Sequence, residues 1–131
     1  MMELTINGNV YNINFGIAFM RELNKKVTIP VEGIPGKSEQ IGLRYEIANF
    51  FDGDIESLIT LIDIGNKGQD PRLTKAAIEA YIEDPDTDID ELFKQVKDFL
   101  LSANVTKKEA LRIQKELDRR AAQEAQENQE E

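Results

Sequence analysis

Residues 3–26 constrain the fold more than any other part of the chain, because they encode a tight hairpin followed directly by an amphipathic helix. Leu4 and Ile6 alternate with polar residues before the dipeptide Asn7-Gly8, and the alternation resumes after it. Asn-Gly suits a two-residue turn because both central positions need a positive φ. A two-stranded ribbon is barely stable alone in water, so this hairpin must pack on other elements.

The rest of the chain carries helical patterns separated by short breaks. Apolar residues recur at helical spacing, and Asp54, Thr74 and Asp88 stand at N-cap positions. Gly65 and Gly68 are expected to end one helix, and Thr106 with Glu109 has the spacing of a capping box. Residues 27–40 are expected to form a loop with a short strand at 27–29. After a first helix near Phe19 and Leu23, we expect helices over residues 41–51, 55–64, 74–83 and 89–100 and a last one from residue 106.

These elements predict a mainly α (α+β) fold, with an N-terminal β-hairpin packed on a bundle of about five to six short helices. With 131 residues, the chain is long enough for one modest core. We expect a single domain over residues 1–120. From Ala121 onward no hydrophobe is larger than alanine, so residues 121–131 are expected to form a flexible, disordered acidic tail.

The composition removes several kinds of chemistry. The chain has no cysteine and no histidine, which excludes thiolate zinc sites and imidazole catalysis. Neither Asp52 nor Asp84 begins a calcium-binding EF-hand loop, because the sixth and twelfth positions hold the wrong residues. The glycines of residues 33–38 are too close together for a phosphate-binding loop. We therefore expect no enzyme activity, no cofactor and no metal.

The charge distribution limits the partners. The net charge is −9, and residues 52–98 hold thirteen acids against five bases. Phosphate binding needs clustered Lys and Arg, so nucleic acid is not an expected partner. No run approaches the roughly 18 apolar residues that cross a bilayer, and no leader pattern begins the chain, so a cytoplasmic location without membrane contact is expected.

Two surfaces are candidates for partner binding. The helix over residues 41–51 has a second apolar face opposite its main one, which indicates either central burial or contact with another molecule. The last helix has only a narrow apolar stripe, so it either frays or becomes ordered on a partner. The candidate interaction surface therefore comprises Ile41, Tyr45, Ala48, Ile113 and Leu117.

With these patterns read, residues 3–108 resemble the phage tail assembly chaperones of long non-contractile-tailed phages and prophages of Gram-positive bacteria. The first half of the resemblance is ELTINGNVYNINFGIAFMRELNKK, a hairpin, a Phe-Gly pair and a helix with Arg-Glu-Leu. The second half is PRLTKAAIEAYIEDPDTDIDELFKQVKDFLLSANVTKK, with a Glu-Asp-Pro break before an Asp-Glu-Leu-Phe helix. Between them GLRYEIANFFDGDIESLITLIDIG fits the helical middle of the family.

The resemblance implies a non-catalytic role in tail morphogenesis, in the cytoplasm of the host bacterium. Such a chaperone coats and solubilises the tape measure protein, helps recruit tail tube subunits, self-associates, and is absent from the mature virion. A longer product made by ribosomal frameshifting would carry the contact to the tail tube protein.

Two other readings stay open. A small acidic regulatory adaptor would bind one folded host or phage protein as a 1:1 complex, whereas the chaperone would form chains or rings. An enzyme that uses carboxylates would need a concave pocket in which several acids converge.

Overall fold

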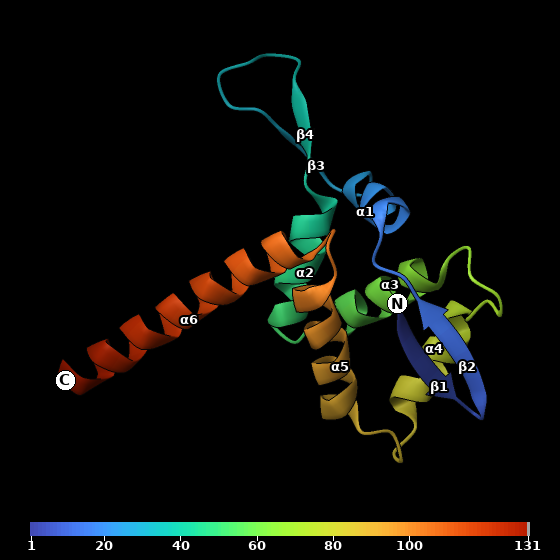
Figure 1. Cartoon of the computed structure of the whole chain (residues 1–131). Helices are drawn as coiled ribbons and strands as arrows, with labels where there is room; N and C mark the ends of the chain where they lie inside the picture. Colours follow the sequence, from blue (N-terminus) through green and yellow to red (C-terminus); the bar gives the residue numbers. More distant parts are fainter. Residues whose placement is uncertain (131) are drawn as a thin grey trace.

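A computed structural model describes residues 1–130 (Figure 1). Over that range the fold contains six helices and two separate two-stranded antiparallel sheets. The prediction of a mainly helical α+β fold is confirmed. The elements are β1 (Met2–Ile6), β2 (Asn9–Ile13), α1 (Ile17–Asn24), β3 (Thr28–Pro30), β4 (Ser38–Gln40), α2 (Gly42–Phe51), α3 (Ile55–Asn66), α4 (Lys75–Glu83), α5 (Ile89–Ser102) and α6 (Lys107–Glu130).

The N-terminal hairpin forms as its alternation predicts. Strand β1 pairs with β2 in a register that closes at Ile6 and Asn9, so Asn7 and Gly8 form a two-residue turn. Their φ angles are 53° and 81°, the left-handed region that such a turn needs. Every second residue of β1 is buried, and the Asn14 amide donates to the Gly65 carbonyl at 2.8 Å. The hairpin therefore packs on α3.

Helix α3 is the centre of the core. Leu58, Leu61 and Ile62 are fully buried, and α3 contacts α1, α2, α4 and β2. Aromatic rings surround this centre: the ring centroid of Phe15 lies 4.5 Å from that of Phe19 and 4.7 Å from that of Phe99. Apolar burial of most of α3 against these elements is the main source of stability for a domain of this size.

Three predicted helix caps are confirmed, and two local predictions are wrong. Asp54, Thr74 and Asp88 each accept a backbone N–H of the first helical turn. Thr106 lies directly before α6, as predicted, and its carbonyl accepts from the Ala110 amide, but it does not form the expected capping box. It is fully buried, and its hydroxyl donates to the Leu100 carbonyl at 2.8 Å. Gly65 does not end a helix either. It lies within α3, where its missing side chain leaves room for the hairpin.

Two elements project from the helical body in Figure 1. The first is the hairpin β3–β4, which replaces most of the loop expected over residues 27–40. The second is the far half of α6, which is helical through Glu130 where a disordered tail was expected from Ala121. Ala, Gln and Glu are strong helix formers, which favours extension of α6 past its last packed turn. The domain boundary at residue 120 stays a prediction, and Glu131 lies outside the described residues.

Candidate functional site

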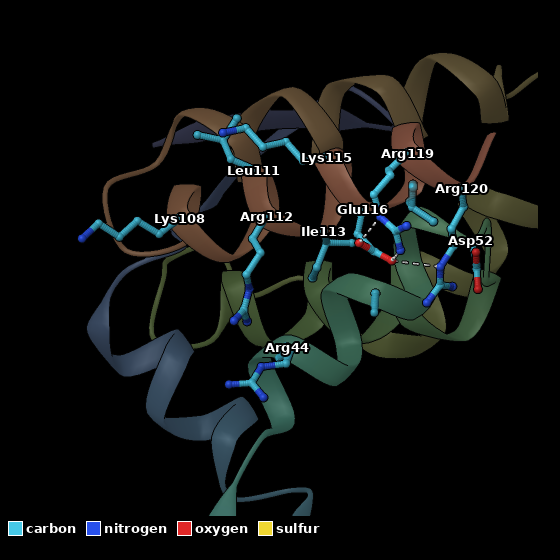
Figure 2. Close-up of a pocket in the computed structure, with 12 residues that line it drawn as sticks. Arg44, Asp52, Lys108, Leu111, Arg112, Ile113, Lys115, Glu116, Arg119 and Arg120 are labelled. Carbon is cyan, nitrogen blue, oxygen red and sulfur yellow. Dashed lines mark hydrogen bonds and ion pairs between the residues drawn. The ribbon is translucent and has the colours of Figure 1, made fainter. Parts of the chain in front are cut away.

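An open groove of about 890 Å³ lies along α6 where this helix packs on α2. The α2 side of the groove consists of Arg44, Ala48 and Asp52, which follow one another at a spacing of four residues. The α6 side consists of residues between 108 and 120, up to the point where α6 leaves the body (Figures 1 and 2). The groove is therefore built by one face of α2 and the first half of α6.

An ion-pair chain joins the two helices at one end of the groove. Arg44 Nε lies 3.7 Å from Glu109 Oε1, and Arg112 pairs with the other oxygen of the same carboxylate. Arg44 also lies 4.0 Å from Glu39 of β4. These pairs are partly exposed, so each contributes little to stability, but together they set the position of α6 on α2.

The groove has an apolar base. Ala48, Ile113 and Leu117 are half-buried there, and Ile113 packs against the core. In Figure 2 Ile113 and Arg112 extend from α6 toward α2, whereas Leu111 and Lys115 extend from the other side of the helix. Leu111 is 46% exposed, which is unusual for leucine on a helix that docks on a core. Apolar surface is thus left uncovered on both sides of the first half of α6.

The rim of the groove is basic, although the chain as a whole is acidic. Only two acids, Asp52 and Glu116, line the groove. Glu116 accepts from Arg119 Nε at 3.1 Å and from Arg120 Nε at 3.3 Å, and the hydrogen bond from Arg119 is the main reason that its pKa is lowered. The six bases of the lining are Arg44, Lys108, Arg112, Lys115, Arg119 and Arg120.

The structure brings three of the five predicted interaction residues together. Ala48, Ile113 and Leu117 all line the groove. Tyr45 and Ile41 lie outside the lining: Ile41 is the half-buried residue that precedes α2, and Tyr45 is 48% exposed on its surface. The use of these five residues for binding stays a prediction.

Sequence analysis missed the basic rim and Leu111. The signal was present, because residues 107–120 hold six of the sixteen bases of the chain. It was hidden by averaging residues 107–120 with the acids that follow them. Counting charge separately for each helix reveals the excess of bases in residues 107–120, although not the groove that they line.

The described part of the chain shows no metal site and no membrane-spanning helix. Within residues 1–130 no three carboxylates lie together in a way that could hold a metal ion. None of the helices described combines the length and the hydropathy that crossing a bilayer requires. Glu46 is the carboxyl group whose surroundings differ most from water: burial, and to a lesser degree Asp54, raises its pKa. It lies on α2 with no second acid in a catalytic arrangement.

The fold and the groove define a small, mainly helical protein with an open groove between α2 and α6. Comparison with known families agrees: the family described as phage tail assembly chaperone protein, TAC, matches residues 3–115. The chain belongs to this family, which confirms the resemblance seen in the sequence. Searches of curated proteins and of solved structures found no match. Members of the family are generally non-catalytic and bind tail proteins during assembly.

Proposed function

We propose that this protein is a non-catalytic chaperone that coats and solubilises the tape measure protein in the cytoplasm of the host bacterium. It helps recruit tail tube subunits and is left out of the mature virion. Membership of the family over residues 3–115 is the observation that carries the proposal. The uncovered α2–α6 surface supports it, because a chaperone needs apolar area that is free before its partner arrives.

The candidate interaction surface divides into two parts in this proposal. Tyr45 contacts the tape measure protein from α2, together with Ile41, which lies one helical turn before it at the N-cap. An exposed tyrosine suits this role because it offers a large rigid ring and a hydroxyl at a low entropy cost. Ala48, Ile113 and Leu117 form the base of a separate, self-association surface in the groove.

Many weak contacts would serve this function better than one tight contact. A tape measure protein offers repeated sites along its length, so neighbouring copies that also touch one another gain avidity. Each copy still leaves readily when tube subunits assemble, because its own affinity is low. A longer frameshifted product would add the contact with the tail tube protein.

A pull-down from cells that produce the parent phage tests the proposal, with mass spectrometry of the eluate and of purified virions. Tape measure and tube proteins in the eluate, together with absence of the chain from virions, would support it. Stoichiometric presence in virions would make the protein a structural component. Capture of one unrelated regulator in a 1:1 complex would favour an adaptor instead.

The variant Tyr45→Glu tests the contact surface. We expect it to lower the yield of soluble tape measure protein on co-expression, without loss of folding. Val10→Glu is the matched control, because Val10 is 47% exposed on the N-terminal hairpin and gains the same charge. Equal yields with both variants would remove Tyr45 from the proposed contact.

A further inference from the structure

Helix α6 is divided into two halves of opposite charge. Residues 107–120 hold six bases and three acids, whereas residues 121–130 hold three glutamates and no base. The first half forms one side of the basic groove, and the second half projects beyond the body (Figure 1). A surface and a segment of complementary charge therefore lie next to each other on one helix.

We propose that the groove of one copy is occupied by the acidic second half of α6 from another copy, in an antiparallel pair. Each α6 would place its second half in the groove of the other, so that two equivalent contacts close a symmetric dimer. The inference rests on the proposed self-association and names its contact. The acidic segment lies beyond the residues that match the family.

The two parts fit in length. The groove follows α6 from Lys108 to Arg120, which is about 18 Å at a rise of 1.5 Å per residue. The ten helical residues 121–130 span about 15 Å. A second copy can therefore fill the groove with its projecting segment, and the two-fold axis would pass near residue 120.

The side chains fit as well. The acidic half offers alanines and no larger hydrophobe, so it can approach Ile113 and Leu117 closely. Its glutamates would meet the basic rim, where opposite charges attract across a partly desolvated contact. Within one copy no such pairing is possible, because a straight helix cannot fold back on itself.

The projecting half also needs a partner for its own stability. Residues 118–129 are all exposed, and a helix of about twelve residues without packing is marginal in water. Docking on a second copy supplies the missing packing. The same contact covers the apolar base of the groove.

Charge reversal in the full chain tests the pairing by sedimentation at low and high salt. The acidic variant carries Glu124→Lys and Glu127→Lys. The groove variant carries Arg112→Glu and Arg120→Glu. The groove variant should fold, because Glu109 keeps Arg44 and Glu116 keeps Arg119 as partners.

We expect the wild type to be a dimer whose dissociation constant rises with salt concentration. For each variant alone, the dissociation constant of the dimer should be about tenfold higher or more. A mixture of the two variants should restore the dimer, because both contacts of the mixed pair again join opposite charges. The control variant carries Glu79→Lys and Glu83→Lys on α4. It changes the net charge of the wild type by the same amount as the acidic variant does, and it should leave the dimer intact.

Single cysteines test the antiparallel geometry, since the natural chain has none. Ala121→Cys lies near the proposed axis and should form a disulfide-linked dimer on mild oxidation. Asn128→Cys lies on the same face of the helix but about 24 Å from its counterpart across the axis, so it should not. Cross-linking of both variants alike would indicate a parallel pair and overturn the proposal.

A monomeric wild type, a dimer that charge reversal leaves unchanged, or assemblies larger than a dimer would also overturn it. A monomeric wild type would remove self-association from the proposed function, but all three results would leave binding of the tape measure protein untouched, because they concern the protein without its partners. Loss of soluble tape measure protein on co-expression is measured separately. A monomeric variant that still solubilises the tape measure protein would show that dimerisation and binding of the tape measure protein are independent.

Discussion

Gly42 lies directly against the carbonyl of Leu23, and a Cβ at position 42 would stand 1.6 Å from that oxygen. The contact joins the start of α2 to the end of α1. Beside it, the Asn24 side chain accepts a hydrogen bond from the Leu43 amide at 3.0 Å, and so satisfies a free N–H at the start of α2. Helices α1 and α2 are thus joined both by this close backbone approach and by one side-chain hydrogen bond.

We predict that Gly42→Ala is the most destabilising single-methyl addition in this protein. The clash is with backbone, which cannot rotate away, so α1 and α2 must separate. The free energy of unfolding should fall by about 3 kcal/mol or more, as measured by urea denaturation. Gly16→Ala is the control, because its Cβ would meet only the Asn14 side chain at 3.3 Å. An unchanged urea midpoint for Gly42→Ala would contradict the predicted clash with the Leu23 carbonyl.

Gly65→Ala should have an intermediate effect. Its Cβ would lie 2.6 Å from Ile13 Cγ2 and 3.0 Å from the Phe15 ring. These are side chains that can shift, and alanine gains up to about 1 kcal/mol of helix propensity over glycine within α3. We expect a net loss of about 1–2 kcal/mol in the same urea assay. A loss equal to that of Gly42→Ala would show that the hairpin cannot adjust.

Asn66→Ala should destabilise the contact between the hairpin and the segment before α4. Asn66 is fully buried, its amide donates to the Asn12 carbonyl at 3.0 Å, and its oxygen accepts from the Leu73 amide at 2.5 Å. Removal leaves buried backbone groups without partners, so the free energy of unfolding should fall by about 2–4 kcal/mol. Thermal and urea unfolding measure it, with the exposed Asn104→Ala as the control. A change below that of the control would refute the role of Asn66.

Glu46→Gln should raise stability at neutral pH. Burial raises the pKa of Glu46 above the ordinary value of 4.5, and Asp54 raises it further. Ser57 lowers the pKa of Glu46, but by less than burial raises it. The Ser57 hydroxyl donates its proton to Asp54 Oδ2 at 3.0 Å. The folded protein therefore holds this proton more tightly than the unfolded chain, and the ionised carboxylate costs stability above that pH range.

The advantage of Glu46→Gln should shrink as the pH falls through the raised pKa toward 4.5 and vanish below it. Melting temperatures of variant and wild type, measured from neutral to acidic pH, check this. Glu79→Gln on the exposed face of α4 is the control. A constant difference between variant and wild type at every pH would show that the effect is not ionisation of Glu46.

The sequence predicts turns and helix caps correctly where the interactions that form them lie within a few residues. The Asn7-Gly8 turn and the caps at Asp54, Thr74 and Asp88 depend on φ preferences and on hydrogen bonds within one turn. Thr106 failed as a cap for the opposite reason. Its hydroxyl donates instead to the Leu100 carbonyl in the last turn of α5, so its bonding depends on where the preceding helix ends.

The candidate site shows the same division. The apolar residues Ala48, Ile113 and Leu117 could be selected from helical spacing, but only the docking of α6 on α2 places them in one groove. The basic rim comes from two helices that are more than fifty residues apart in sequence. No pattern within one helix could have shown that they line one surface.

By itself, the sequence determined the opening hairpin, most of the helices and their caps, the absence of cysteine and histidine chemistry, and the resemblance to the family. All of these follow from side-chain chemistry and spacing within a few residues. Tertiary structure alone decided that Gly42 and Gly65 are contact points and that the acidic chain has a basic groove. Those features depend on which distant surfaces meet, and helix packing decides this through close approach and burial.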